Sequence, residues 1–445
     1  MARFKLHCRH PLIGGAFALY YDNQTSTLTD DQGRPATAVE VKRYSEFGLA
    51  VSADTPGRKT GKATFLKIQM GLSCNYSCTY CSQRFVPRAA AMSLKDAGAF
   101  LEKLPSWFSG GKDGLGAGVT VQFWGGEPLV YWAALKLLAE GMRARYPNIR
   151  LSTITNGSLL TPEIVEWLDA MGFALAMSHD GPGQATRGPD PMADPQQRAI
   201  ILDLYRRLRP QGRMSISAML HKDSQSRAAI ARWLAEAFED ETIIISEGGF
   251  VDAYDEGGLA SSLPAEDAVA FRVKAFEDLR SGAAQNFEIA HSKIHDFINS
   301  VQTARPASSL GQKCGMDRPD TMAVDLKGRV MTCQNVSAVA PAPNGQNHML
   351  GSVDDLDRVE LRSATHWSKR PDCATCPVLQ LCRGACMFLE GENWAASCAN
   401  SYSTAIPFLA AGVEVLTSLV VERIEPLDED LPLDRQWLWV EPPNK

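Results

Sequence analysis

The sequence predicts an α/β protein centred on a partial (β/α)6 TIM-like barrel, with a β-rich module before it and a cysteine-rich region after it. Between residues 63 and 250, short apolar runs alternate with amphipathic stretches of helical length, and the rhythm then stops. Such alternation implies parallel strands joined by crossover helices. Because six units are fewer than the eight that close a full barrel, we expect an open one, with its chemistry at the carboxyl ends of the strands.

The elements of the barrel follow from these apolar runs. The predicted strands are Phe65–Met70, Val119–Trp124, Arg150–Thr155, Ala174–Ser178, Met214–Met219 and Thr242–Ser246. The predicted crossover helices lie near Ser93–Leu104, Tyr131–Arg145, Pro162–Met171, Pro195–Arg209 and Gln225–Ala237. Two further helices are expected at Pro264–Leu279 and Phe287–Val301.

The chain therefore divides into five predicted units. They are a β-rich N-terminal module (1–60), the barrel (63–250), a helical bridge (251–309), a cysteine-rich domain (310–402) and a C-terminal helix and tail (403–445). A region that is poor in apolar pattern but dense in cysteine is usually held together by metals.

Composition excludes some classes of partner. The chain of 445 residues is 22% charged, has a net charge of -6 and contains no Lys/Arg-rich run, so we expect neither nucleic acid nor an anionic membrane as partner. No apolar stretch reaches the roughly 18 residues that span a bilayer. We expect a cytoplasmic protein, and in that reducing compartment clustered cysteines are more often metal ligands or catalytic groups than disulfides.

Ten of the eleven cysteines fall into two spaced sets. The first set is Cys74, Cys78 and Cys81, and the second is Cys314, Cys333, Cys373, Cys376, Cys382, Cys386 and Cys398. Sets of three and seven thiolates cannot be divided into complete four-ligand sites. At least one metal therefore lacks a full set of cysteine ligands. Three thiolates on a four-iron, four-sulfur cluster leave one iron without a protein ligand. Structural zinc sites are the alternative for both sets.

With Tyr80 directly before its last cysteine, the loop Cys74–Cys81 resembles the signature of the radical S-adenosylmethionine (SAM) enzymes. In that family the open iron binds SAM, and one electron from the cluster cleaves SAM to a 5′-deoxyadenosyl radical that abstracts hydrogen from the substrate. The resemblance implies that Tyr80 lies near the adenine of SAM.

Other motifs at the predicted strand ends extend this resemblance. They are Gly125-Gly126-Glu127-Pro128, Thr155-Asn156-Gly157 and Ser178-His179-Asp180-Gly181. By resemblance, Gly125, Gly126 and Glu127 bind the amino group of SAM, for which Glu127 is a nearby anion. Asn156 and Ser178 would contact the ribose or shape its pocket.

The order and gaps of the second cysteine set resemble the SPASM extension of radical SAM enzymes, which commonly holds two auxiliary iron–sulfur clusters. Carried over by position, Cys373, Cys376, Cys382 and Cys398 fill the distal cluster, and Cys314, Cys333 and Cys386 hold the nearer one. Some members have a further cysteine shortly after the first, but residues 315–332 contain none. The nearer cluster should therefore have an open iron, a non-cysteine ligand or less iron. Cys8 is left over, either as a remote ligand or as a small buried apolar residue.

The resemblance implies three iron–sulfur clusters and SAM as cofactors, with flavodoxin or ferredoxin as external electron donor. Since radical SAM/SPASM enzymes mostly modify peptides or proteins, we expect a cross-linking or oxidising peptide maturase. The alternatives are a sulfatase (formylglycine) maturase, an enzyme that oxidises a small molecule such as a tetrapyrrole, and a non-catalytic metal-binding or electron-transfer protein. Sulfatase maturases carry an acid at the position of Gln334 and tend to have Gln at the position of Trp124, so we rank that role lower.

The general base is not evident from the motifs. His179, Asp180, Glu247 and Asp252 lie at or beyond predicted strand ends and are the candidate acids and bases. The N-terminal module would either bind a leader peptide as an added strand or pack as a hairpin against the barrel.

Overall fold

The barrel strands and their crossover helices lie where the apolar runs predict them. The computed structural model describes residues 2–37, 58–83, 92–109, 118–341, 345, 347–360, 366–370 and 372–427. The barrel strands are β4 (Phe65–Gln69), β5 (Thr120–Trp124), β6 (Arg150–Thr155), β7 (Ala174–Ser178), β8 (Met214–Leu220) and β9 (Ile245–Phe250). Each pairs in parallel with the next, which confirms the partial barrel.

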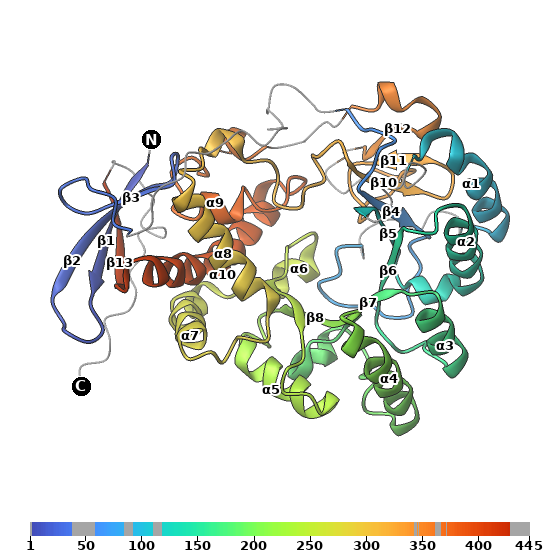
Figure 1. Cartoon of the computed structure of the whole chain (residues 1–445), viewed down its shortest axis with the longest axis horizontal. Coiled ribbons are helices and arrows are strands. Elements are labelled where there is room, and N and C mark those ends of the chain that lie inside the picture. Colours follow the sequence, from blue (N-terminus) through green and yellow to red (C-terminus); the bar gives the residue numbers. More distant parts are fainter. Residues whose placement is uncertain are drawn as a thin grey trace.

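Five helices connect these strands. They are α1 (Leu94–Trp107), α2 (Trp132–Arg145), α3 (Pro162–Ala170), α4 (Pro195–Leu208) and α5 (Arg227–Phe238). Figure 1 shows them outside the arc of strands. Local sequence explains their starts, since Thr161 caps the first turn of α3 and Ser226 caps α5, each with its hydroxyl accepting a backbone N–H.

The last barrel strand begins three residues later than predicted and ends four residues later. Gly248 and Gly249 resemble a turn in the sequence, but both lie inside β9. The pairing of β9 with β8 slips between Ala218 and Leu220, and Glu247 and Gly248 have positive φ angles there. The glycines therefore form a bulge in the strand instead of ending it.

The cysteine-rich region extends the barrel sheet, which the sequence did not predict. β10 (Thr321–Asp325) pairs in parallel with β4, and β11 (Arg329–Met331) and β12 (Met349–Ser352) follow antiparallel. The nine described strands of this sheet run in the order β12-β11-β10-β4-β5-β6-β7-β8-β9. Every residue of β10 is buried, so its sequence shows none of the alternation that marks a half-exposed strand. Cys333 follows the last residue of β11 by two positions.

The remaining helices pack at the open side of the barrel. They are α6 (Glu256–Ala260), α7 (Ala268–Arg280), α8 (Glu288–Gln302), α9 (Leu379–Cys382) and α10 (Gly391–Thr417). The two predicted bridge helices are confirmed as α7 and α8. Since α10 is continuous, the expected boundary between residues 402 and 403 falls inside a helix. Among the described helices, none is long and apolar enough to cross a membrane.

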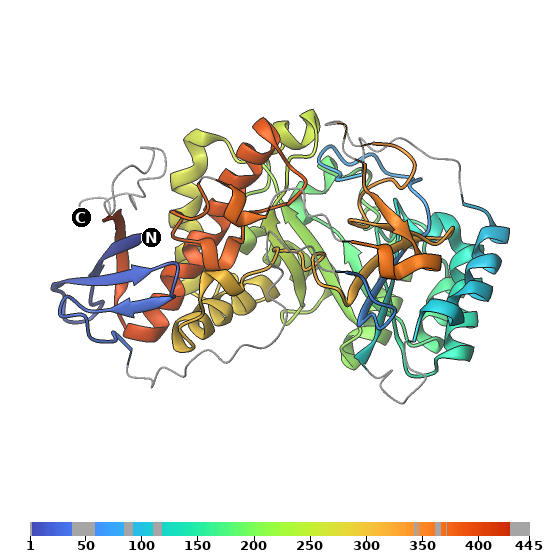
Figure 2. The same ribbon diagram turned by 90° about the horizontal axis from the view of Figure 1, so that it is seen from above.

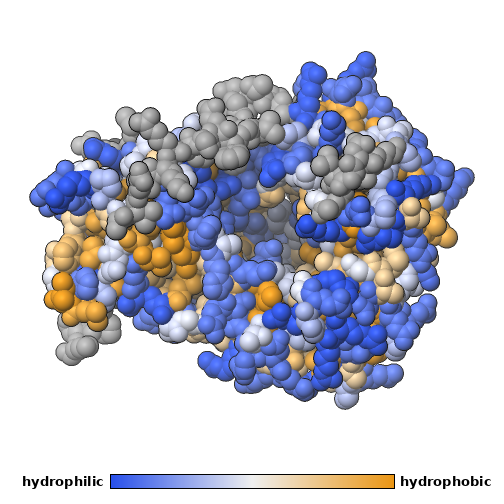
Figure 3. All heavy atoms as spheres, viewed as in Figure 1, coloured by the Kyte–Doolittle hydropathy of each residue, from blue (hydrophilic) through white to orange (hydrophobic). Residues whose placement is uncertain are grey.

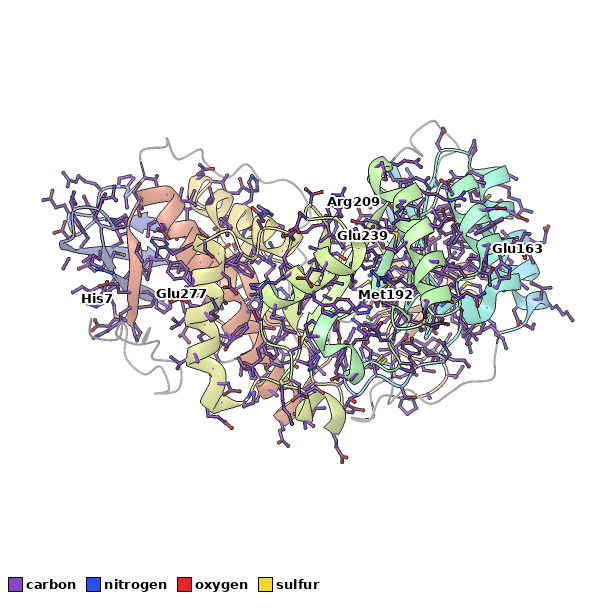
Figure 4. All side chains as sticks on the ribbon, turned by 90° about the horizontal axis from the view of Figure 1, so that it is seen from below. His7, Glu163, Met192, Arg209, Glu239 and Glu277 are labelled. Atoms are coloured by element: carbon purple, nitrogen blue, oxygen red, sulfur yellow. The ribbon has the colours of Figure 1, made fainter. Side chains whose placement is uncertain are left out.

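The N-terminal module is β-rich as predicted, but it incorporates the end of the chain. Its sheet has the order β13-β1-β2-β3, with β1 (Arg3–Arg9), β2 (Ala16–Asp22), β3 (Thr27–Thr29) and β13 (Val420–Pro426). Residues 38–57 of the expected module lie outside the described residues. Figure 2 shows this sheet beside α10, and in Figure 4 His7 lies at the opposite end of the molecule from Glu163 of α3.

This sheet contacts α8 and the cysteine-rich region, which corrects the expectation that it packs against the barrel. The rings of Tyr21 and Phe297 lie 5.6 Å apart. Asn23 is fully buried, and its amide donates to the carbonyl oxygens of Ala374 at 3.0 Å and Cys376 at 2.8 Å. Cys8 is buried within β1, where burial raises the pKa of its thiol to about 12. This burial is what the apolar alternative for Cys8 predicts.

Candidate active site

A cavity of about 390 Å³ lies at the carboxyl ends of the barrel strands. That volume is typical of a pocket for a small molecule. Figure 3 shows a hollow near the middle of one face of the molecule. The lining includes every residue that the sequence assigns to the first cluster and to SAM: Cys74, Cys78, Cys81, Tyr80, Gly125, Gly126, Glu127, Asn156 and Ser178. Residues from four separate loops thus converge as predicted.

The first three cysteines follow β4, and backbone N–H groups point at two of their sulfurs. The N–H of Tyr76 lies 3.4 Å from Sγ of Cys74, and the N–H of Gln83 lies 3.4 Å from Sγ of Cys81. Such hydrogen bonds favour thiolates over thiols. Burial raises the pKa of Cys78 to about 12, and the nearby guanidinium of Arg187 opposes that shift.

The glycines of Gly-Gly-Glu-Pro are required by close packing against the cysteine loop. A Cβ atom on Gly126 would lie 2.3 Å from the carbonyl oxygen of Ser73, and one on Gly125 would lie 2.7 Å from that of Gly71. The N–H of Gly126 donates to Gly71 and that of Glu127 donates to Ser73, at 3.1 and 3.0 Å. These residues therefore hold the loop that carries Cys74.

Glu127 links the ends of β5 and β6. Its carboxylate accepts hydrogen bonds from the N–H of Leu129, the hydroxyl of Thr155 and the N–H of Asn156, at 3.0, 2.8 and 2.8 Å. Burial raises the pKa of Glu127, and these hydrogen bonds oppose that shift. The amide of Asn156 in turn donates to Asn75, beside Cys74, at 2.9 Å. Glu127 thus organises the pocket besides lining it.

Tyr80 belongs to a buried polar group that the sequence did not reveal. Its hydroxyl donates to Asp180, which also forms an ion pair with Arg187 at 2.9 Å. The Arg187 guanidinium lies 5.6 Å from the Tyr80 ring, and His221 stacks on that ring at 5.7 Å. Arg187 lines the cavity, whereas Asp180 does not. Arg187 follows the predicted strand by nine residues in an irregular segment, so no periodic signal identifies it.

The four candidate acids and bases separate into two pairs. His179 is fully buried and stacks on Trp233, and its Nε2 lies 3.0 Å from Asp190. Neither His179 nor Asp180 lines the cavity, contrary to the expectation that they face it, because both side chains pack behind the strand ends. Glu247 and Asp252 do line it.

Three polar side-chain atoms of the cavity wall are open to a ligand. Trp124 Nε1, Asp252 Oδ1 and Asn335 Oδ1 are buried and have no hydrogen-bond partner among the described residues. All three residues line the cavity. A buried polar group without a partner is costly, so these atoms are available to a ligand.

Four of the seven later cysteines share a second, smaller cavity. Cys373, Cys376, Cys382 and Cys398 all line it, beside Tyr402. Sulfur atoms around one cavity fit an iron–sulfur cluster, whose irons and sulfides occupy the space between its ligands. Within the described residues, no three His, Cys, Asp or Glu side chains are grouped to bind a single metal ion.

The other three later cysteines lie apart from that cavity. Cys333 is buried in an apolar cluster against which Cys386 packs. Burial, and then the neighbouring Cys314, raises the pKa of Cys333 to about 11. Burial lowers the pKa of Lys67, and the nearby Cys333 and Cys314 oppose that shift. The Lys67 ammonium is a positive group suited to thiolates. The cysteines are thus separated into four and three.

Comparison with known proteins agrees with this site. Residues 68–234 match the model of the Radical SAM superfamily. Residues 68–234 therefore form a radical SAM domain. The chain is 26% identical over 141 residues to the radical SAM cyclopropyl synthase TigE of Paramaledivibacter caminithermalis. That match spans 27% of this chain and 28% of TigE, well under two thirds of either protein. The superfamily implies a four-iron, four-sulfur cluster and SAM.

Solved structures share the fold of this chain over most of its length. Native anSMEcpe with bound AdoMet and Cp18Cys peptide has a TM-score of 0.54 at 18% identity, covering 78% of this chain and 96% of that chain. Native anSMEcpe with bound AdoMet has a TM-score of 0.55 at 17% identity, with the same coverage.

Proposed function

We propose that this enzyme cleaves SAM reductively and uses the resulting 5′-deoxyadenosyl radical to abstract hydrogen from a peptide or protein side chain, giving a cross-link or an oxidised residue. The observation that carries this proposal is the convergence of Cys74, Cys78 and Cys81 with the Gly-Gly-Glu-Pro segment on one cavity. A cluster held by three cysteines keeps one iron open for SAM.

The cavity residues have distinct roles in this proposal. When bound, the cluster supplies the electron that cleaves SAM. The Gly125–Glu127 backbone and Asn156 bind the amino group and ribose of SAM, and Tyr80 packs against its adenine. Arg187 places a cation beside Cys78, where it complements the carboxylate of SAM. Asp180 positions both Tyr80 and Arg187 through its hydrogen bond and ion pair.

The seven later cysteines hold two auxiliary clusters, and flavodoxin or ferredoxin supplies electrons. The cavity lined by Cys373, Cys376, Cys382 and Cys398 supports a fully ligated distal cluster. Cys314, Cys333 and Cys386 hold the nearer one.

The N-terminal sheet is expected to retain the distal cluster. Replacing Asn23 with alanine removes two hydrogen bonds to the loop of Cys373 and Cys376, a loss of about 1–3 kcal/mol. The Asn23→Ala variant should lose iron to a chelator several-fold faster than the parent, as measured by the absorbance of the chelated iron.

A matched control is available in the barrel. The amide of Asn286 also donates to two carbonyl oxygens, those of Glu241 and Ile243, at 2.9 and 3.0 Å. The Asn286→Ala variant should lower stability without accelerating iron loss. Equal iron loss from both variants would contradict a specific role for Asn23.

Three unpaired polar atoms of the cavity support a peptide substrate. Trp124 Nε1 offers a donor, and the unpaired oxygens of Asp252 and Asn335 offer acceptors. This set complements a peptide group, which carries one C=O and one N–H. The structural neighbour anSMEcpe is itself described with a bound Cp18Cys peptide.

Deuterium transfer to 5′-deoxyadenosine tests the proposed reaction. The reconstituted enzyme is incubated with SAM, dithionite and synthetic deuterated peptides that contain Cys or aromatic residues. We expect a change in peptide mass together with one deuterium in 5′-deoxyadenosine. A parallel reaction with a sulfatase-derived Cys peptide tests for formylglycine formation. If SAM is cleaved but only a small molecule such as a tetrapyrrole is changed, the peptide assignment is wrong.

A further inference from the structure

Tyr254 connects the SAM cavity with the nearer cysteine set. It follows β9 by four residues and lines the 390 Å³ cavity. Its hydroxyl donates a hydrogen bond to Sγ of Cys386 at 3.4 Å. A single side chain therefore contacts both the space where the radical forms and a sulfur of the second site.

We propose that Tyr254 tunes the nearer auxiliary cluster, raising its reduction potential through the hydrogen bond from its hydroxyl to the Cys386 sulfur. This inference rests on the proposed function, because it requires that cluster. Cys386 belongs to the nearer set, since it packs with Cys333 in one apolar cluster and does not line the cavity of the other four cysteines.

The direction of the effect follows from electrostatics. A reduced cluster carries one more negative charge than an oxidised one, and a hydrogen bond to a ligand sulfur stabilises that charge. Hydrogen bonds to the sulfurs, net charge and solvent exposure set the potentials of such clusters. A higher potential makes the cluster a better acceptor for one electron from a substrate radical formed in the cavity.

Asp252 should act on the same cluster in the opposite direction. Asp252 precedes Tyr254 by two residues, and its carboxylate lines the same cavity. A negative group destabilises the reduced cluster and lowers its potential. The two residues thus predict shifts of opposite sign at one site.

An EPR-monitored redox titration tests the inference. The parent is the full chain with Cys74, Cys78 and Cys81 changed to alanine, so that only the auxiliary clusters titrate, with europium(II) chelates as low-potential reductants. In the Tyr254→Phe variant, the ratio of reduced to oxidised cluster at fixed potential should fall about tenfold for one of the two signals. That change corresponds to about 59 mV for one electron. Asp252→Asn should move the same signal upward.

The controls separate tuning from damage. Tyr205 donates to Asp240 at 2.7 Å on the outer side of the barrel, and Tyr205→Phe should leave both signals unchanged. An unmoved nearer signal in a Tyr254→Phe variant that retains its iron overturns the inference, as does a parent whose iron and EPR signals account for only one cluster. SAM cleavage by the wild-type chain is measured separately. Its absence would refute the proposed function, whereas cleavage with unmoved potentials would refute the tuning role alone.

Discussion

Replacing Cys78 with alanine is expected to abolish formation of 5′-deoxyadenosine while leaving the auxiliary iron in place. Cys78 lines the SAM cavity with Cys74 and Cys81, so its removal leaves the first cluster with two ligands. We expect SAM cleavage to fall more than about 100-fold. Even the loss of a residue that only hydrogen-bonds a metal ligand lowers metal affinity or activity about 10–100-fold. Chromatography of the reaction with SAM and dithionite gives the activity, and iron analysis should show about four irons fewer per chain.

Cys8 provides the matched control for this substitution. It is buried within β1, far from both cysteine sets in the sequence, and its thiol donates a hydrogen bond within its own strand, to the Leu6 carbonyl oxygen at 3.6 Å. Cys8→Ala should cost about 1 kcal/mol of stability and leave iron and SAM cleavage unchanged. Retained cleavage in Cys78→Ala, or loss of iron in Cys8→Ala, would contradict the assignment of the cysteines.

Replacing Gly126 with alanine is expected to displace the cysteine loop. The added methyl group would meet the Ser73 carbonyl oxygen at 2.3 Å, and backbone cannot move aside as a flexible side chain can. Overpacking of this kind costs about 1–3 kcal/mol. Because Ser73 directly precedes Cys74, SAM cleavage should fall at least tenfold, with lower iron at the first site. Thermal unfolding and the 5′-deoxyadenosine assay measure the two effects.

Gly98 of α1 is the control for Gly126. A Cβ atom there meets nothing within 4 Å, and alanine favours a helix by about 0.5–1 kcal/mol over glycine. Gly98→Ala should therefore stabilise the protein slightly and leave SAM cleavage unchanged. If the two variants had the same stability and the same SAM cleavage, close packing would not explain why position 126 requires glycine.

The barrel was predictable because its signals are local. Short apolar runs mark β4 to β8, and β6 and β7 have the predicted bounds. The lining of the cavity was predictable for the same reason, since each motif directly follows a strand. Once the strands are parallel, their carboxyl ends must meet at one edge of the sheet.

Pairing between distant segments could not be predicted. β13 pairs with β1 across more than 400 residues, and β10 joins β4 across about 250. Their partners lie far away in the sequence, and β10 lacks alternation because it is wholly buried. The roles of single side chains were hidden too. Asp180 binds Tyr80 and Arg187 instead of facing the cavity, and Tyr254 meets Cys386 through a fold contact with no motif.

We propose above all that Cys74, Cys78 and Cys81 hold a cluster that cleaves SAM. The most direct measurement is anaerobic reconstitution of the wild-type chain with iron and sulfide, followed by dithionite and SAM. We expect 5′-deoxyadenosine, formed by a protein that holds three clusters and at most about twelve irons per chain. A fully reconstituted protein that forms no 5′-deoxyadenosine would contradict the proposal.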